Sequence, residues 1–598
     1  MIARMTKYSF IVYQPELGDF LEKVQELGMV DTRRENKAVD NHSKELLNAV
    51  QSNSLVIKKL KELKESLTEV TPPESGLQTD LNAKEVFKAV ESSLENRDIW
   101  IAEEKSLIKE LEESVIWGSY NKEDIHRLES LGYKLHFYCV SENNFNPEWD
   151  KEYLMQVLNK EGGKYYFVIL SPVGADFLFK NPESRFPQNS FDIVEQKLKE
   201  VRNNISNSNS YLAEVLKKVD FLEKALDSDK SVLDLYLAGI SSQIEAEGTL
   251  ALITGFAPES NKDELKQFFD KENVYYIAED AHEDDNPPIK LKNNFFTRLF
   301  EPIGDLYMLP RYGELDLTPY FAPFYMLFFG LCLGDIGYGL VLLIVGTIGK
   351  LKLAKFKEYL TLVQLLGIGS IIMPLLTGSI FGTKLGVLFP LPDSINSLFF
   401  SDIKMFWFAI VFGILQIVFA RIINAIFSIV TKGWQYGMHN IGWAIVIVWA
   451  SMSYAKTMVP GMVIPPYVNY IGMFGCLLIL FFSATEGNII TRILKGTFAF
   501  YDITGVFGDV LSYIRLFGLG TSGGILGYVV NSIAMNMYDI PYVGWFFTAL
   551  MLLVGHTFVL LLSSLGAFVH PMRLTFVEFY KNSGFTGGGK AFRPLTKN

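Results

Sequence analysis

The sequence predicts a multi-domain protein: N-terminal cytoplasmic α/β lobes joined by an antiparallel coiled coil, then an all-α membrane domain of about eight transmembrane helices. Of the 598 residues, 49% are hydrophobic, and the mean hydropathy of +0.19 is too apolar for a soluble chain of this length. Residues 1–319 hold 38 basic and 57 acidic side chains, whereas residues 320–598 hold only 17 and 9. We therefore expect a cytoplasmic domain at 1–315 and a transmembrane domain at 316–598. The acidic first half argues against nucleic-acid binding.

The sequence predicts short strands and helices near the start, in the middle and near the end of the cytoplasmic domain. Alternating apolar residues predict a strand near Tyr8–Val12. Strands at Lys134–Val140 and Tyr165–Leu170 predict a βαβ-like piece. A strand at Leu250–Phe256 and a helix at Lys262–Lys271 complete the domain. These segments predict two small lobes.

Between the lobes, two long helical stretches at about 37–116 and 189–247 predict a coiled-coil rod. In the second stretch, apolar residues recur at steps of 7, 3, 4, 3 and 4 from Ile205 to Leu226, as in a coiled coil. The first stretch is broken by Thr71–Gly76, which contains two prolines. The rod is either a plain spacer or a strut that resists torque between the lobes, and the sequence leaves both open.

The membrane domain consists of apolar blocks separated by short polar segments. The blocks run at about 319–349, 359–381, 405–430, 438–456, 467–485, 498–535 and 541–570. Asp335 lies near the middle of the first block, where Gly334–Gly339 predicts a turn between two short arms. Counting this block as a hairpin gives eight spans with both termini cytoplasmic.

The positive-inside rule supports the hairpin. With the first domain in the cytoplasm, only Lys384, Lys404 and Lys456 fall outside. Twelve basic residues fall inside: Lys350, Lys352, Lys355, Lys357, Arg421, Lys432, Arg492, Lys495, Lys581, Lys590, Arg593 and Lys597. A single first span would move every later loop to the other side.

Arg515 is the strongest candidate for a functional residue. It lies in an apolar stretch that holds only two other charges, Asp502 and Asp509. A guanidinium cannot lose its proton to escape the bilayer, and holding it there costs roughly 2.5 kcal/mol or more. Snorkelling to the surface is the simpler explanation, but Arg515 lies well inside its span. The position therefore predicts a charge-handling site.

On its own helix, Arg515 shares one face with a polar residue, and the neighbouring face consists largely of glycines. Ser512 shares the stripe of Arg515. Asp509 is six residues away on a different face, so it does not neutralise Arg515 through its own helix. Several glycines lie beside this stripe and allow another helix to approach closely. The predicted small face consists of Gly520, Gly523, Gly524 and Gly527.

A second arginine, Arg573, ends the last apolar block. His570 lies three residues earlier and shares its helical face. Glu578 lies five residues later, about 140° around an α-helix, so it is not a direct partner. Arg573 either snorkels to the surface or forms a wet vestibule with His570 and Glu578, and both interpretations stay open.

Several ordered motifs resemble one family. Gly508–Gly520 (GDVLSYIRLFGLG) and His570–Glu578 (HPMRLTFVE) resemble signatures of the large membrane subunit of V/A-type rotary ATPases, called subunit a, or subunit I in prokaryotes. The other matching segments are Pro302–Pro310, Leu317–Phe324, Phe329–Gly339 and Leu376–Gly382. The series runs from Pro302 to the C-terminus and corresponds to the shorter, prokaryotic form.

The resemblance implies a role for each matched residue. Arg515 would be the stator arginine that faces the carboxylates of a rotating proteolipid ring across the glycine face. Arg573 would be its companion, and Glu578, with His570, Ser512 and Asp509 nearby, would line an ion path. The family departs from this chain at Gly518 and Gly520, where it often has alanine-like residues, and Pro571 interrupts the last span.

The resemblance also implies partners and a location. The chain would work in the Vo sector with the proteolipid c/K ring, with peripheral-stalk E/G-type subunits on its lobes, and with central-stalk-associated subunits. It would be a multi-pass protein of a prokaryotic cell membrane. No Gly-x-x-x-x-Gly-Lys-Ser/Thr motif is present, so nucleotide chemistry would belong to other subunits. We expect no cofactor, and the three scattered cysteines give no metal-site spacing.

Two other functions were weighed. A self-contained secondary transporter with a large cytoplasmic domain is the main alternative, but such transporters often contain two similar membrane halves, and no repeat is evident here. A passive membrane scaffold accounts for the rod but not for Arg515. The sequence leaves open whether the ion is H⁺ or Na⁺ and whether the motor pumps or synthesises.

Overall fold

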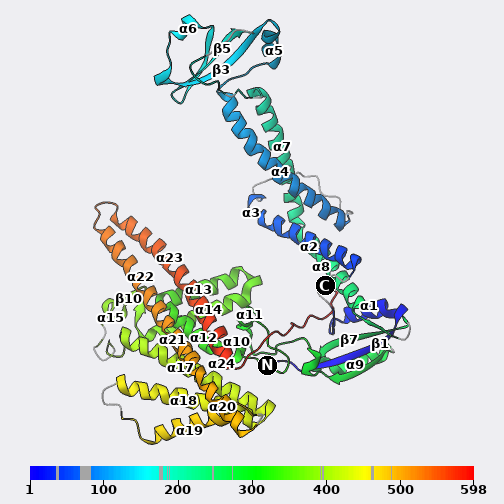
Figure 1. The fold of residues 1–598 in the computed structure, drawn as a ribbon, viewed down its shortest axis with the longest axis vertical. Coiled ribbons are helices and arrows are strands. Elements are labelled where there is room, and N and C mark those ends of the chain that lie inside the picture. Colours follow the sequence, from blue (N-terminus) through cyan, green and yellow to red (C-terminus); the bar gives the residue numbers. More distant parts are fainter. Residues whose placement is uncertain are drawn as a thin grey trace. The chain divides into compact units, whose positions relative to one another are not determined.

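The computed structural model describes residues 1–34, 40–67, 82–173, 179–184, 186–187, 189–245, 248–272, 274–390, 392, 396–458, 463–485 and 488–597. These residues form two compact units. One contains Met1–Ile11 and Thr254–Pro594, and the other contains Val12–Ile253 and Leu595–Asn598. Figure 1 shows the elements of both units, coloured along the chain.

The unit that contains Val12–Ile253 is built from long helices and a small sheet. Its helices are α1 (Leu17–Leu27), α2 (Asn41–Glu62), α3 (Lys64–Leu67), α4 (Ala83–Val115), α5 (Lys122–Ser130), α6 (Trp149–Glu152), α7 (Phe191–Lys217) and α8 (Val219–Ile240). Its strands are β2 (Asp31–Thr32), β3 (Tyr133–Ser141), β4 (Met155–Glu161), β5 (Lys164–Pro172) and β6 (Gln243–Glu245). Strand β7 (Leu250–Pro258) begins in this unit and ends in the other.

The helices of this unit pack in pairs, α4 beside α7 and α2 beside α8 (Figure 1). Their apolar faces form separate buried clusters, and the larger one includes Leu212 and Val215 of α7 and Leu222 and Leu226 of α8. These are members of the apolar repeat found in the sequence. The chain leaves helical geometry at Lys218, however, so the repeat is divided between two helices. The predicted break at Thr71–Gly76 lies outside the described residues.

The sheet at the far end of α4 and α7 corrects one prediction. Its strand order is β3-β5-β4, and both pairings are antiparallel, so the segment is not βαβ-like. Strands β4 and β5 are joined by Gly162 and Gly163, both with positive φ. Two residues with positive φ form the tight turn that suits the twist of an antiparallel hairpin. The predicted strands themselves exist, slightly longer than expected.

A second sheet has the strand order β2-β7-β1-β8, with β6 paired to β7. Strand β1 (Met5–Tyr13) pairs antiparallel with β8 (Tyr275–Asp280) from Thr6–Asp280 to Ile11–Tyr275. Helix α9 (Lys262–Lys271) contributes Phe269, whose ring lies 4.9 Å from that of Phe10. The strand and helix predicted at 250–271 are therefore present.

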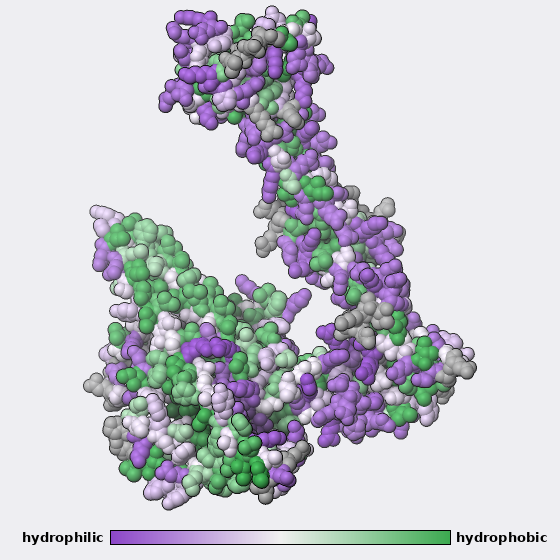
Figure 2. Space-filling view, in the orientation of Figure 1, coloured by the Kyte–Doolittle hydropathy of each residue, from purple (hydrophilic) through white to green (hydrophobic). Residues whose placement is uncertain are grey.

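From Phe295 onward, the unit that contains Thr254–Pro594 is almost entirely helical. Its elements are α10 (Phe295–Arg298), α11 (Glu301–Asp305), α12 (Thr318–Leu333), α13 (Ile336–Lys352), α14 (Lys357–Ile372), β9 (Ser379–Ile380), β10 (Thr383–Lys384), α15 (Leu385–Leu388), α17 (Asp402–Lys432), α18 (Trp434–Met458), α19 (Tyr467–Phe482), α20 (Ile489–Ala499), α21 (Ile503–Ser512), α22 (Ile514–Tyr538), α23 (Gly544–Arg573), a π-helix (Leu574–Phe579) and α24 (Tyr580–Asn582). Hydrophobic surface, green in Figure 2, covers α22 and α23, where Leu553, Leu561 and Leu565 are all exposed. Exposed apolar helices of this kind are typical of a protein solvated by lipid.

The break predicted inside the first apolar block is present. Gly334 ends α12 in the left-handed conformation, and Asp335 caps the N-terminus of α13. The turn is shorter than predicted, because the residues from Ile336 onward are already helical. Among the described residues, four helical stretches are long and apolar enough to cross a membrane: Lys357–Leu376, Asp402–Lys432, Ile490–Tyr538 and Gly544–Asn582. The total of about eight spans stays a prediction.

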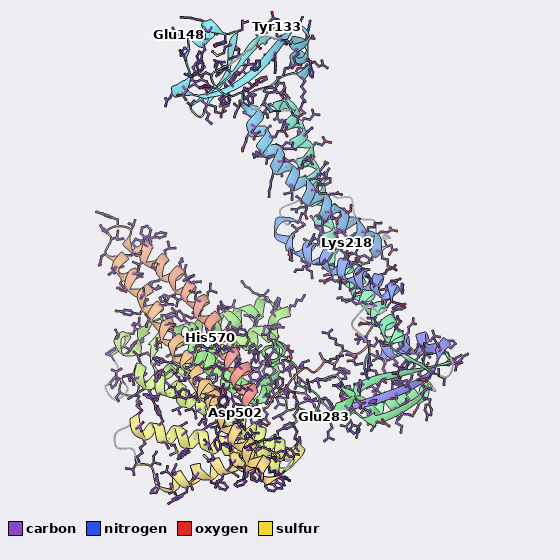
Figure 3. The ribbon with its side chains drawn as sticks, viewed as in Figure 1. Tyr133, Glu148, Lys218, Glu283, Asp502 and His570 are labelled. Carbon is purple, nitrogen blue, oxygen red and sulfur yellow. The ribbon has the colours of Figure 1, made fainter. Side chains whose placement is uncertain are left out.

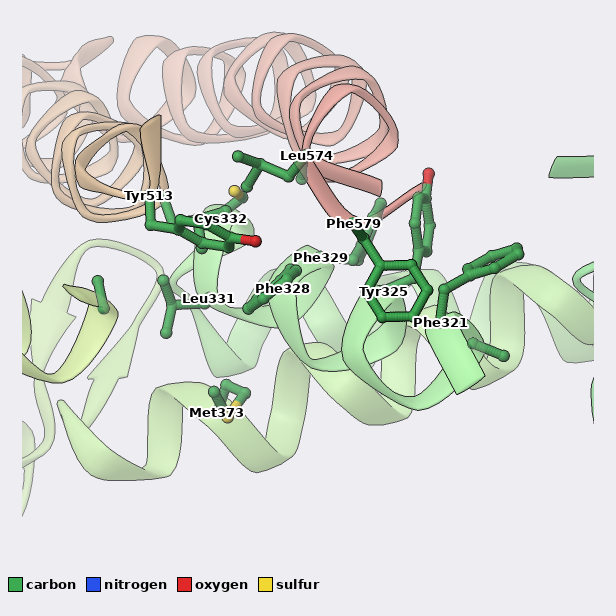
Figure 4. Packing of buried hydrophobic residues seen from close by; sticks show 14 of the residues in the cluster. Phe321, Tyr325, Phe328, Phe329, Leu331, Cys332, Met373, Tyr513, Leu574 and Phe579 are labelled. Carbon is green, nitrogen blue, oxygen red and sulfur yellow. The ribbon is translucent and has the colours of Figure 1, made fainter. Parts of the chain in front are cut away.

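Helix α12 forms the centre of the membrane unit's core. Phe321, Tyr325, Phe328 and Cys332 recur at steps of 4, 3 and 4 on its buried face. Figure 4 shows this face toward the helices that carry Tyr513 and Leu574. The Phe328 ring lies 5.8 Å from that of Tyr513. One helix therefore supports both α22 and the end of α23.

Candidate functional site

Arg515 is held by well-packed neighbours, but no described residue forms an ion pair with it. Tyr513 and Leu516 on either side of it are fully buried, and the Tyr513 hydroxyl donates to Oε1 of Gln416 on α17 at 2.7 Å. Arg515 itself is half-buried. Its Nη1 is buried without a hydrogen-bond partner, and no carboxylate lies within 4 Å among the described residues. Packing therefore holds the start of α22 in place, while the positive charge of Arg515 stays free to pair with a group from outside the described residues.

The structure brings Arg515, His570 and Arg573 into electrostatic reach of one another. His570, labelled in Figure 3, is half-buried on α23, and the guanidiniums of Arg515 and Arg573 both act electrostatically on its imidazole. The Arg573 side chain is exposed and makes no ion pair with any described residue. Two guanidiniums on neighbouring helices thus lie on either side of one imidazole in sequence and act on it together.

The end of α23 is not a simple α-helix. Pro571 lacks the N–H that would bond the carbonyl of Ala567, and the adjacent Phe568 carbonyl accepts a 2.8 Å hydrogen bond from the Tyr325 hydroxyl. A π-helix follows directly after Arg573. Its bonds join residues five apart, so Arg573 and Glu578 lie about one turn apart. The α-helical spacing assumed from the sequence was wrong here.

Glu578 is almost completely buried, at 1% exposure. Its Oε2 has no hydrogen-bond partner within the described residues. Ser512 and Arg573 lie close enough to interact with its carboxyl group, and the Ser512 hydroxyl also donates to the Gly508 carbonyl at 3.1 Å. A buried carboxyl oxygen without a donor can accept a proton or a cation.

Asp509 is paired, and its partners were missed in the sequence. Lys581 Nζ lies 3.3 Å from both of its carboxyl oxygens, and Asn582 Nδ2 donates to Oδ2 at 3.0 Å. Asn582 also donates to the backbone carbonyl of Glu578 at 2.7 Å. Asp509 and Glu578 therefore belong to one polar cluster at the end of α23, and Asp509 does not neutralise Arg515.

The predicted glycine face needs correction. A side chain at Gly520 would meet the Leu331 carbonyl at 2.4 Å, and one at Gly527 would meet Gly382 Cα at 3.1 Å. Gly523 faces Ser563 Oγ at 3.2 Å. These three glycines pack against this chain's own helices and hairpin, and only Gly524 of the four has open space beside it.

Arg421 is a third arginine of the membrane unit whose position the sequence did not reveal. It lies within α17 rather than in a cytoplasmic loop, largely buried against Trp443. Its Nη1 donates to Asn440 Oδ1 at 3.3 Å, and it interacts electrostatically with Asp502 and Asp509. Its assignment to the inside of the membrane stays a prediction. Its place within an apolar helix was the available signal.

A cavity of about 410 Å³ lies beside α22, beginning just beyond Arg515. It runs along Phe517, Thr521 and Tyr528 of that helix. The opposite wall is formed by the β9–β10 hairpin and the first residues of α17, and Lys384 and Asp402 are its charged members. Among the described residues, no three His, Cys, Asp or Glu side chains are grouped as metal ligands would be.

Comparison with known proteins places these features in a family. A family model described as the V-type ATPase 116kDa subunit family matches residues 19–365, more than half of the chain. The V-type ATP synthase subunit I of Borreliella burgdorferi is 24% identical over 628 residues, which cover 100% of both chains. The A-type ATP synthase subunit I of Methanocaldococcus jannaschii is 29% identical over 464 residues, covering 66% of each chain.

One solved structure also matches: the cytoplasmic N-terminal domain of subunit I, homolog of subunit a, of V-ATPase. It is 12% identical, with a TM-score of 0.19, and covers 46% of this chain and 100% of that one, a similarity too low to support any conclusion. The apolar helices and the relatives identify a membrane protein. On the strength of the matched residues 19–365, the chain belongs to the V-type ATPase 116kDa subunit family.

Proposed function

We propose that this chain is the stator subunit of the membrane sector of a rotary V/A-type ATPase, and that it provides the ion path against a rotating proteolipid ring. The observation that carries the proposal is the half-buried Arg515 on α22, whose Nη1 is buried and has no hydrogen-bond partner among the described residues. A charge in an apolar helix is costly unless it is paired, so its counter-charge has to come from elsewhere. A ring carboxylate that passes α22 meets this requirement.

Arg515 acts on each ring carboxylate in turn. A nearby guanidinium favours the charged form of a carboxyl group and so promotes release of its bound H⁺ or Na⁺. The same positive charge repels the free cation, which prevents direct passage across the membrane. An ion therefore travels with the ring between two separate access paths.

Two features near Arg515 suit these paths. Where α22 begins, Glu578, Ser512 and Asp509 form the polar cluster that we assign to the cytoplasmic path. Along the first half of α22, the cavity beside Phe517–Tyr528 supplies access from the outside. A ring helix can approach closely at Gly524, which has open space, but not through the three glycines that pack within the chain.

We assign the remaining partners by position in the chain. The cytoplasmic lobes, built on the sheets β3-β5-β4 and β2-β7-β1-β8, bind peripheral-stalk E/G-type subunits, and central-stalk-associated subunits complete the assembly. The membrane is the prokaryotic cell membrane, with both termini cytoplasmic. ATP is hydrolysed or made on other subunits.

The test is ATP-driven ion uptake by the intact complex in vesicles. Arg515→Ala should reduce uptake to background, and Arg515→Lys should retain a small part of it, because an ammonium keeps the charge but not the guanidinium geometry. Lys432→Ala, at the exposed end of α17, is the matched control and should pump normally. Wild-type uptake by Arg515→Ala would refute the stator function.

One further variant and one further measurement separate the other candidates. Arg573→Ala should reduce uptake less than Arg515→Ala, because the Arg573 side chain is exposed. Equal loss in both variants would place Arg573 in the essential step. Ion uptake by the isolated chain, without ATP or other subunits, would instead support the secondary transporter.

A further inference from the structure

The hairpin of β9 and β10 is fastened to the membrane unit by a polar cluster that the ion path does not use. We define this clasp as Asp335, Tyr338, Asn531 and His556. We propose that the clasp positions the hairpin as a fixed wall of the cavity beside α22, and that none of its members carries the transported ion. The proposal rests on the proposed function, in which this cavity is the outer access path.

Asp335 is the centre of the clasp. It is completely buried, and both of its carboxyl oxygens are used as acceptors. Oδ1 accepts from the backbone N–H groups of Gly337, Tyr338 and Phe381 at 2.8, 3.2 and 2.8 Å. Oδ2 accepts from the Gly382 N–H at 2.8 Å and the Ser379 hydroxyl at 3.1 Å. Five donors enclose the carboxylate, so it has no oxygen free for a cation.

Asn531 of α22 holds the other side of the hairpin. Its Nδ2 donates to the Phe381 carbonyl at 2.7 Å and to Thr383 Oγ1 at 3.2 Å. Since Nδ2 provides both donors, the amide oxygen is left as an acceptor. That oxygen faces Nε2 of His556 at 3.0 Å.

The tautomer of His556 follows from these bonds. Nε2 must carry the proton that Asn531 Oδ1 accepts, so in the neutral ring Nδ1 is an acceptor. Nδ1 lies 2.9 Å from the Tyr338 hydroxyl, which therefore donates to it. The neutral imidazole satisfies both neighbours, and the three side chains link α13, α22 and α23. A ring that repeatedly gained and lost a proton would break this chain of bonds.

The contact between the hairpin and α22 is backbone against backbone. Gly382 has φ +74, and a side chain there would lie 2.3 Å from the Tyr528 nitrogen. Ser379, Gly382, Thr383 and Lys384 all line the cavity. Any loosening of the clasp would therefore move the cavity wall directly.

Asn531 and His556, the members of the clasp on α22 and α23, lie away from the arginine. Asn531 follows Arg515 by 16 residues on α22, about 24 Å along the helix axis. A change at His556 therefore leaves the Arg515 environment in place and acts on it only through the cavity wall. This separation makes the role testable.

The experiment measures the position of the hairpin without turnover. In the detergent-solubilised complex, a cysteine introduced as Lys384→Cys is labelled with a maleimide, and the same complex without Lys384→Cys corrects for the native cysteines. His556→Ala should change the labelling rate roughly tenfold, since removing one partner leaves buried polar groups unpaired. His556→Gln, which can accept and donate without charge, should restore the rate to within about twofold. Thr557→Ala, whose hydroxyl bonds within α23, is the matched control.

Transport then separates positioning from ion transfer. In vesicles, His556→Ala should lower the ratio of ions moved to ATP hydrolysed, and His556→Gln should restore it. A labelling rate in His556→Ala equal to that of Thr557→Ala would refute the clasp. Restored labelling with transport still lost in His556→Gln would show that His556 carries the ion, which also overturns the proposal.

Two additional variants keep the test decisive if His556→Ala does not assemble. Tyr338→Phe removes one bond of the clasp, and Gly382→Ala forces the hairpin away from α22; both should raise the labelling rate. Normal labelling in both would overturn the proposal. Failure of the stator function would appear in the uptake of Arg515→Ala, whereas the labelling result is independent of uptake.

Discussion

Arg515 and Asp335 are charged side chains in the same membrane unit, and the fold treats them in opposite ways. Asp335 is completely buried and accepts five hydrogen bonds. Arg515 is half-buried, and its Nη1 is buried with no partner. A charge that is satisfied within the chain holds the structure together, whereas a charge left unsatisfied is available to something outside it. The contrast predicts opposite responses to substitution.

The largest loss of stability is expected for Asp335→Ala. It leaves four backbone N–H groups and a hydroxyl without their acceptor, and each unpaired buried group costs about 1–3 kcal/mol. We expect the thermal denaturation midpoint of the purified complex to fall steeply or the subunit to be lost. Asp539→Ala, at the exposed end of α22, should melt like the wild type. Equal midpoints for the two variants would show that the Asp335 bonds contribute little.

The opposite sign is expected for Arg515→Ala. The substitution abolishes transport but removes a charge whose insertion costs roughly 2.5 kcal/mol or more. The denaturation midpoint should therefore stay unchanged or rise. A midpoint that falls as far as that of Asp335→Ala would mean that Arg515 is a structural residue, and the contrast between the two charges would disappear.

An intermediate effect is expected at Asp509 and Lys581, which are paired but unequally buried. The Lys581 side chain is 57% exposed and that of Asp509 is 11% exposed. Lys581→Ala should cost less than about 1 kcal/mol, because exposed ion pairs contribute little. Asp509→Ala should cost about 1–3 kcal/mol, because it removes one of the two acceptors of the buried Asn582 amide. Thermal denaturation of both variants checks the order, and a larger loss for Lys581→Ala would reverse it.

The smallest effect is expected for a charge that is satisfied but exposed. Hydrogen bonds from Ser43 and the Tyr236 hydroxyl lower the pKa of Asp40, the N-cap of α2, to about 2. Because this pKa lies below the ordinary value of about 3.9, the cap stabilises α2 above that value and is lost as the pH falls through about 2. Amide exchange at the first turn of α2 should be faster in Asp40→Ala than in the wild type at pH 6. The difference should shrink as the pH falls through about 2 and vanish only well below it. A difference that keeps its full size there would exclude the carboxylate as its cause.

Much of the membrane fold could be predicted because it depends on local chemistry. The Gly-Asp pair inside an apolar run predicted the turn at Gly334. In the structure Asp335 caps the helix that follows. The antiparallel order of β3, β5 and β4 was missed, although Gly162–Gly163 is a hairpin signal. Helix α23 runs through Pro571 and then widens into a π-helix, and helical periodicity alone did not predict this change.

The candidate site was predicted only in part. Arg515 stood out because an arginine in an apolar helix is rare and costly. The partners of Asp509 and the inward-facing glycines were not found, because helical spacing shows which residues share a face but not which helix approaches that face. The Asp335 clasp was missed for the same reason, since three of the five donors to Asp335 come from residues 44 to 47 positions away.

The sequence by itself determined the division into an acidic half and an apolar half, the family motifs and the presence of an isolated charge in α22. These properties depend on residue type and short-range spacing, because water solvates charged side chains and lipid solvates apolar ones. Tertiary structure alone decided which charged side chains have a hydrogen-bond or ion-pair partner within the chain. Asp335 accepts hydrogen bonds from the β9–β10 hairpin, and Asp509 is bound by Lys581 and Asn582. Arg515 has no described carboxylate within 4 Å. The reason is that a hydrogen bond depends on positions accurate to a few tenths of an ångström, and packing between distant segments sets those positions.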